Sequence, residues 1–327
     1  MSLCKLYLEN SIDTLAAIEN FNVSYEGIIE DFFRKLHEWY TKAKNFILKM
    51  VDKLIYNINI IRNKLSGRFI APLQEIYKKL MRADDIRKSN INDKLKNKSI
   101  EAYEVNSTAI ANYEKFVVAA VKDIDEATKS ITVDGMLRTL YFPKKNITES
   151  FMEETVNELS HKLNVIDILG NTTLNEYKSK GNLILSDREV LIPGSKYKFK
   201  SYKIEKNNNI FTIIYKIKTY DDCVTFVKNS LNGLQPILSD KGNLNTIQNS
   251  ISKTYEAVKV NAGYDDIPEE LKNSEAFNNY KRITYAVTEF SKEVALFKYE
   301  LIKDVQNIYT SIGTRSLPAV MALSTLI

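Results

Sequence analysis

A long apolar repeat with almost nothing to interrupt it constrains this chain more than any other feature. Between about residues 25 and 65, apolar side chains recur every three or four positions, the period of one face of an α-helix. The whole chain of 327 residues holds only 10 Gly and 6 Pro, the two residues that break helices most strongly. We therefore expect long helices packed into a bundle. The apolar stripe consists of Leu36, Tyr40, Ala43, Ile47, Met50, Leu54, Ile58, Ile61 and Leu65.

Helical periodicity returns in several later segments. Ser66-Gly67 is expected to end the first helix, and Pro72 suits the first turn of the next one. Thr148 is expected to cap the start of another helix, and Gly313 is expected to end the last long one. The other helices are predicted over residues 73–98, 99–131, 221–232, 244–260 and 275–312.

After Gly181 the apolar period becomes two, which is typical of β-strands. The run Asn207-Asn208-Asn209 is expected to form the turn between the last two strands. The predicted fold class is α+β: mainly long helices in a bundle, with a small antiparallel β module inserted at about residues 181–220. The strand-like runs are NLIL, EVLI, SKYKFKSYKIE and NIFTIIYKIK.

These patterns divide the chain into three regions. Residues 1–131 form an N-terminal helical region, and residues 132–240 form a mixed α/β insert with a β hairpin. Residues 241–327 supply a long C-terminal helix that packs back on the bundle and ends in an apolar tail. We expect helices from both ends of the sequence to share one core.

Residues that commonly carry catalysis or bind metals are few and scattered. His37 and His161 are the only histidines, and HEWYT lacks the second His of a zinc HExxH motif. Cys4 and Cys223 lie far apart, with no pattern of a disulfide framework. Acidic pairs such as Asp84-Asp85 are explained by helix starts, and no phosphate-binding or nucleophile motif occurs. We therefore expect no enzyme activity, no catalytic or metal-binding residue, and no cofactor.

Basic residues gather in blocks and provide candidate partner-binding surfaces, although the net charge is only +5. The first block lies on the first helix, whose aromatic residues fall mostly on the apolar stripe, so its lysines are expected to face solvent. A membrane-surface helix and a nucleic-acid surface remain alternatives for this block. The second block lies on one side of a strand, where lysines guard an edge against aggregation or form a polyanion-binding ribbon. The candidates are Lys42, Lys44, Lys49 and Lys53 in the first block, and Lys196, Lys198 and Lys200 in the second.

The last eleven or so residues form an apolar tail with no charge after Arg315. Such a segment is expected to close the protein's own core or to dock in a neighbouring subunit. The N-terminus has no basic stretch followed by an apolar run, so we expect no signal peptide. No uncharged apolar stretch reaches the ~18 residues of a membrane-spanning helix, so we expect no stable membrane insertion. The tail candidates are Leu317, Val320, Met321, Leu323, Leu326 and Ile327.

The N-terminal part of the sequence begins with an acidic segment, LENSIDTLAAIEN. An amphipathic helix rich in Lys, Phe and Trp follows it, EDFFRKLHEWYTKAKNFILKMVDKL. Over about residues 5–65 this arrangement resembles the N-terminal parts of virion structural proteins of large tailed bacteriophages with AT-rich genomes, particularly internal head proteins. The resemblance is one of composition. The resemblance also implies candidate cleavage sites for a prohead protease, after Glu9 and Glu19.

The resemblance implies a structural, head-associated protein made in the host bacterial cytoplasm and located in the virion. It would pack against other virion proteins or against copies of itself, with packaged DNA as a further contact. Two alternatives stay open: a peripheral membrane-active helical protein, and a nucleic-acid-binding accessory protein.

Overall fold

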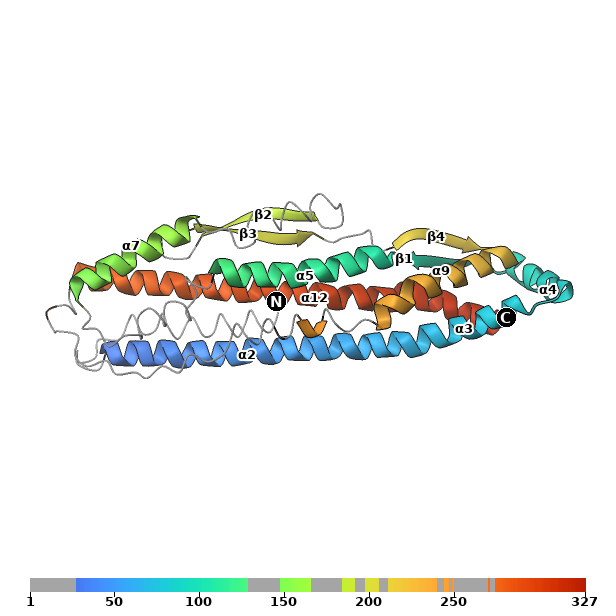
Figure 1. The fold of residues 1–327 in the computed structure, drawn as a ribbon, viewed down its shortest axis with the longest axis horizontal. Helices are drawn as coiled ribbons and strands as arrows, with labels where there is room; N and C mark the ends of the chain where they lie inside the picture. Colours follow the sequence, from blue (N-terminus) through green and yellow to red (C-terminus); the bar gives the residue numbers. More distant parts are fainter. Residues whose placement is uncertain are drawn as a thin grey trace.

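Two long helices set the shape of the molecule. The computed structural model describes residues 28–128, 148–165, 184–191, 198–205, 211–239, 244–246, 249, 270 and 274–327. Helix α2 (Ile28–Leu65) has 38 residues and helix α12 (Glu275–Leu326) has 52. The two pack side by side along the long axis of an elongated body (Figure 1). At about 1.5 Å per residue, α12 alone is ~78 Å long.

Helix α12 is the centre of the fold. Helices α5 (Ser107–Thr128) and α7 (Glu149–Val165) pack on it along one side, and α2 packs along another (Figure 1). Helix α9 (Tyr220–Ser239) covers α3 (Ala71–Met81) and α5 towards the opposite end from α7. Helices from both ends of the sequence therefore share one core, which confirms the predicted α+β class with a helical bundle.

The caps of two helices follow from their sequences. The backbone N–H of Phe151 donates to the side-chain oxygen of Thr148 at 3.2 Å, which confirms Thr148 as the N-cap of α7. At the start of α12, the N–H of Phe277 donates to the Ser274 hydroxyl at 3.1 Å. Each cap satisfies one of the N–H groups that a helix leaves unpaired at its start.

The predicted helix end at Ser66-Gly67 is wrong. The chain continues through a π-helical turn, η2 (Ser66–Ile70), directly into α3. This turn places Phe69 in the core with no exposed surface, and burial of a Phe outweighs the modest helix cost of one Gly. The predicted helix over 73–98 is divided, since α3 ends at Met81 and α4 (Asp85–Lys96) begins after the Asp84 cap.

The predicted helix over 99–131 begins later than expected, because residues 100–105 form strand β1 (Ile100–Val105). Strand β1 pairs antiparallel with β4 (Phe211–Ile217), with a register shift between Glu104 and Val105. Its Ile100, Ala102 and Val105 side chains are buried. Helix α5 then starts behind Asn106, whose side chain accepts from the N–H of Ala109 at 2.9 Å.

The inserted β module is therefore split between two pairs of strands. Strands β2 (Ile184–Leu191) and β3 (Lys198–Glu205) form one antiparallel pair, within the predicted range of 181–220. Strand β4 pairs with β1 instead of β3, so the expected pairing of the last two strands around Asn207–Asn209 is wrong. The turn itself lies outside the described residues.

The predicted end of the last helix at Gly313 is also wrong, because α12 runs through Gly313 and Pro318 to Leu326. A Cβ at Gly313 would lie 3.3 Å from Cδ2 of Leu65, so this glycine allows the end of α2 to approach α12 closely. The helix predicted over 221–232 is confirmed within α9, whereas most of 244–260 lies outside the described residues. Both expected domain limits, at 131/132 and 240/241, also lie outside them.

Candidate interaction surfaces

The lysines predicted to face solvent on the first helix do so where their side chains are described. Lys42, Lys49 and Lys53 are exposed on α2. On the other side of the same helix, Val51 and Ile55 are buried in the core. Lys44 lies within α2, but its side chain is outside the described part. The face of α2 therefore offers positive charge to a partner while its apolar stripe packs inward.

The lysines of the β hairpin have a simpler role. Lys198 is exposed and forms an ion pair with Glu189 on the neighbouring strand, with 2.7 Å between Nζ and Oε1. Lys200 lies opposite Glu189 in the register of β2 and β3, although its side chain is not described, and Lys196 lies outside the described residues. Cross-strand pairs of opposite charge stabilise a hairpin, so Lys198 contributes to the β2–β3 pair itself.

The apolar tail is the last part of α12, and it closes the protein's own core. Val320 and Leu323 are fully buried, and Leu326 is 9% exposed. Leu317 and Ile327 are half-buried against the same core, whereas Met321 is 62% exposed. Lys94 of α4 donates to the carbonyl of Leu326 at 3.1 Å. Of the two expectations for the tail, packing within the chain is the one observed.

Two aspartates at helix starts, Asp84 and Asp222, accept capping hydrogen bonds. Asp84 accepts from the N–H of Arg87 at 2.8 Å. Asp222 accepts from the N–H groups of Lys218 and Thr219 at 3.0 and 2.9 Å. Burial raises the pKa of the Asp222 carboxyl, but the hydrogen bonds from Lys218 and Thr219 outweigh burial and leave its pKa below the ordinary value.

In the described part of the chain, Cys223 lies in the core and His161 lies on the surface. Cys223 is fully buried, and burial raises the pKa of its thiol to about 12, so it packs as a small apolar side chain. His161 is exposed on α7. Within the described ranges, no three His, Cys, Asp or Glu side chains gather where they could hold a metal. No described helix combines the length and apolarity that crossing a membrane requires.

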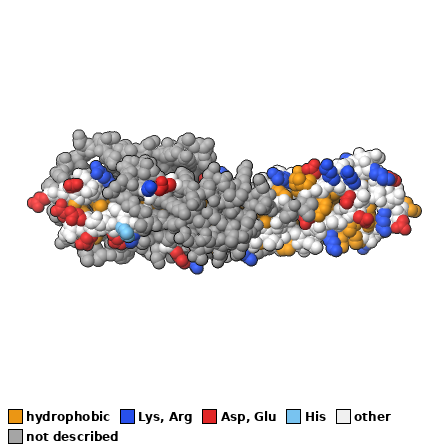
Figure 2. Space-filling view, turned by 90° about the horizontal axis from the view of Figure 1, so that it is seen from above, with side chains coloured by type: hydrophobic (Ala, Val, Ile, Leu, Met, Phe, Trp, Pro, Cys, Tyr) orange, Lys and Arg blue, Asp and Glu red, His pale blue; other side chains and the backbone are white. Residues whose placement is uncertain are grey.

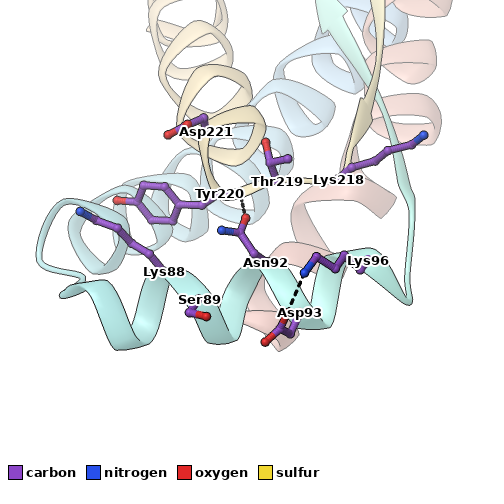
Figure 3. Close-up of a pocket in the computed structure, with 9 residues that line it drawn as sticks. All are labelled: Lys88, Ser89, Asn92, Asp93, Lys96, Lys218, Thr219, Tyr220 and Asp221. Atoms are coloured by element: carbon purple, nitrogen blue, oxygen red, sulfur yellow. Dashed lines mark hydrogen bonds and ion pairs between the residues drawn. The ribbon is translucent and has the colours of Figure 1, made fainter.

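A pocket of about 610 Å³ lies between α4 and the start of α9 (Figure 3). One hydrogen bond at the pocket joins the two helices, because the N–H of Tyr220 donates to the Asn92 side chain at 2.7 Å. The Tyr220 hydroxyl donates to the Leu80 carbonyl of α3 at 2.5 Å. Lys96 forms an ion pair with Asp93 of the same helix at 3.0 Å. These polar groups therefore have partners within the fold. It is lined by Lys88, Ser89, Asn92, Asp93, Lys96, Lys218, Thr219, Tyr220 and Asp221.

A buried polar cluster, which the sequence did not predict, joins four helices. Arg62 of α2 is 2% exposed and donates from Nη2 to the carbonyl of Ile237, in the last turn of α9. The carbonyls in that turn have no N–H partner within the helix. The positive charge of Arg62 also interacts favourably with the negative end of the helix dipole. The guanidinium carbon of Arg62 lies 5.2 Å from the centre of the Tyr309 ring on α12. The Tyr309 hydroxyl donates to buried Glu114 of α5 at 2.7 Å.

Charge is distributed unevenly along the body (Figure 2). At one end, α7 carries four Glu against one Lys. At the other end, residues 71–98 carry eight Lys or Arg against four Asp or Glu. The acidic side chains are more frequent near α7 in this view, and the basic ones near α4. We call the first region the acidic end and the second the basic end.

Comparisons with protein-family models, with curated proteins and with solved structures find no match to this chain.

Proposed function

We propose that the protein is a non-enzymatic structural protein of a tailed-phage particle, associated with the head, which works by packing against neighbouring proteins. The observation that carries this proposal is the elongated body. A single helix, α12, spans ~78 Å at the usual rise per residue, and it is covered along its length by α7, α5, α2 and α3. A rod with a continuous core can connect parts of an assembly at a fixed separation.

The use of the polar residues supports this proposal. Asp84 and Asp222 cap helices, Arg62 binds the end of α9, and Lys198 pairs with Glu189. Each of these contacts joins elements of the fold or caps the start of a helix. The exposed charged side chains are available to bind partners. They include Lys42, Lys49 and Lys53 on α2. We propose other virion proteins as these partners, in a particle assembled in the host bacterial cytoplasm.

A second candidate function is that of a nucleic-acid-binding accessory protein. The excess of Lys and Arg over residues 71–98 favours it, because contacts with DNA phosphates are made chiefly by cations. Packaged DNA would then be a partner of the basic end. This candidate predicts DNA binding that weakens steeply with salt; no binding to duplex DNA at about 50 mM salt counts against it.

The membrane-active alternative has less support on α2. Its strongest feature in the sequence is the apolar stripe of the first helix. Leu54, Ile58 and Leu65 of this stripe are at most 7% exposed, so they pack against the rest of the bundle and are covered from lipid. An interfacial helix binds through an accessible apolar face.

Mass spectrometry of purified phage particles tests the proposal. Peptides of this protein are expected at many copies per particle, and they should remain after particles are banded on a density gradient and treated with protease to remove adhering protein. Particles that contain none of it, from infected cells that do produce the protein, would contradict the proposal.

A further inference from the structure

We propose that two copies of this chain pair side by side in opposite directions, so that the acidic end of each lies against the basic end of the other. This inference rests on the proposed structural function and adds a partner to it, a second copy of the same chain. It depends on three observations: the unpaired acidic residues of α7, the unpaired cations around α3 and α4, and the rigid helix between them.

The acidic end exposes more negative charge than its own residues neutralise. Glu149, Glu153, Glu154 and Glu158 are all exposed on α7. Lys162 pairs with Glu158, and the Ser150 hydroxyl donates to Glu154 at 3.2 Å. Within the described part of the chain, Glu149 and Glu153 take part in no ion pair. This face therefore attracts cations from a second molecule.

The basic end shows the opposite imbalance, because its acidic side chains are already engaged. Three of them pair with lysines one turn away: Glu75 with Lys78 at 3.0 Å, Asp85 with Lys88 at 3.3 Å, and Asp93 with Lys96 at 3.0 Å. The fourth, Asp84, caps α4.

Four exposed cations at the basic end have no acidic partner within 4 Å among the described residues. Two lie at the end of α3, one lies in the first turn of α4, and one follows the end of α4. Their positive field reaches Glu75, whose pKa is lowered first by Lys78 and further by the cations of Lys79 and Arg82. The four are Lys79, Arg82, Arg87 and Lys98.

The rigid body between the ends fixes how the charges can be matched. Helix α7 packs on α12, and the other end of α12 is bonded to α4 through Lys94 and Leu326. The two ends are separated by most of the length of α12, far beyond the ~8 Å over which charges act in physiological salt, so they do not neutralise each other within one molecule.

Only one arrangement of two rods satisfies both ends at once. Side-by-side pairing in the same direction places like charges together. End-to-end pairing leaves one acidic and one basic end free. Antiparallel pairing repeats the same contact twice about a two-fold axis and closes the assembly. Exposed ion pairs are individually weak and screened by salt, so we expect self-association to weaken at least about tenfold between about 50 and about 500 mM salt.

A charge-swap experiment tests this pairing. The acidic-end variant carries Glu153→Lys and Glu154→Lys, which leave α7 with three Lys against two Glu. The basic-end variant carries Lys79→Glu, Arg87→Glu and Lys98→Glu, which leave residues 71–98 with five Lys or Arg against seven Asp or Glu. All five side chains are exposed, and none of them caps a helix. Each variant alone then has two ends of like charge, so sedimentation velocity at low salt should show monomers. An equimolar mixture should restore a dimer of one copy of each, because both ends of each positive molecule then meet negative ends of its partner.

A matched control changes the same charge elsewhere. Lys42→Glu with Lys49→Glu and Lys53→Glu alters net charge as the basic-end variant does, on the exposed face of α2. This control should dimerise like the wild type. Circular dichroism confirms that each variant is folded. A wild type that is monomeric at low salt, a mixture that stays monomeric, growth into longer chains, or an equal loss in the control would each overturn the pairing.

Nucleic acid is the competing partner for the basic end, and the same variants separate it. If the wild type is monomeric but binds a 30-base-pair duplex, and only the basic-end variant loses that binding, the partner is DNA and the pairing is overturned. The presence of the protein in purified particles does not depend on any of these results, so failure of the pairing and failure of the proposed function are distinguishable.

Discussion

Replacing Leu323 by Ala tests whether the apolar tail belongs to the core of the chain that carries it. Leu323 has no exposed surface and lies in the last turns of α12. The change deletes three carbon atoms, and at ~0.8 kcal/mol for each buried methylene the transfer term alone is ~2.4 kcal/mol. The cavity left behind adds to this, so the free energy of unfolding should fall by about 2–5 kcal/mol.

Guanidinium denaturation followed by circular dichroism measures this loss, and Met321→Ala is the matched control. Met321 lies two residues away in the same helix but is 62% exposed, so its truncation should change the free energy of unfolding by less than about 0.5 kcal/mol. If both variants unfold like the wild type, the tail contributes nothing to the monomer. The reasoning that places it in the chain's own core would then be refuted, and docking on a neighbouring subunit would be the better interpretation.

Three other perturbations follow from the packing. Gly313→Leu should destabilise the fold by about 1–3 kcal/mol, because even a Cβ at this position would lie 3.3 Å from Leu65. Adding Leu65→Ala should recover part of this loss in a double-mutant cycle. If the two changes in the free energy of unfolding simply add, the two residues are not in contact. Tyr309→Phe removes the hydroxyl that donates to Glu114 at 2.7 Å and should cost about 1–3 kcal/mol by denaturant titration, whereas an unchanged midpoint would mean that Glu114 does not depend on this donor. Burial raises the pKa of Cys223 from 9.0 to about 12, so the folded state keeps a proton that the unfolded chain loses; this contribution to stability is complete below pH 9 and is lost as the pH rises towards 12. Cys223→Ala should flatten that part of the pH profile of the unfolding midpoint, and a profile equally steep in both proteins would contradict the assignment.

The long helices could be predicted because their signals are local. The apolar stripe of α2, the Thr148 cap of α7 and the scarcity of Gly and Pro all lie within a few residues of the structure they determine. Helix α2 begins at Ile28, close to the predicted start, although the chain continues helically past the predicted end. The exposure of Lys42, Lys49 and Lys53 follows from the same periodicity.

The errors concern features decided by residues far away in the sequence. Strand β1 is short and pairs with β4, where the Tyr215 hydroxyl donates to Glu104 across 111 residues of sequence, so no local pattern distinguishes it from the start of a helix. Gly313 was expected to end α12, but the helix continues through it, and the close approach of Leu65 accounts for a small residue there. In each case tertiary packing outweighs local propensity.

The candidate surfaces divide in the same way. Arg62 falls on the apolar stripe, between Ile58 and Leu65, and a charged residue at a core position was the available signal for its buried role. The basic and acidic ends could not be located from charge blocks alone, because their separation depends on which helices lie at which end of α12. The apolar composition of the tail predicted that it would be covered. Whether the chain's own core or a neighbouring subunit covers it could be decided only from the structure.

Cross-linking mass spectrometry on intact, purified phage particles tests the central claim most directly, because that claim concerns packing against neighbours in an assembly. With a lysine-reactive reagent, exposed lysines such as Lys42, Lys49, Lys53 and Lys98 should give cross-links to other virion proteins. Lys162 of α7 should also link to Lys98, beside the end of α4, in a second copy, because these two ends are too far apart to react within one chain. Particles in which the protein is present but forms only links within its own chain, or particles that lack it, would contradict the account.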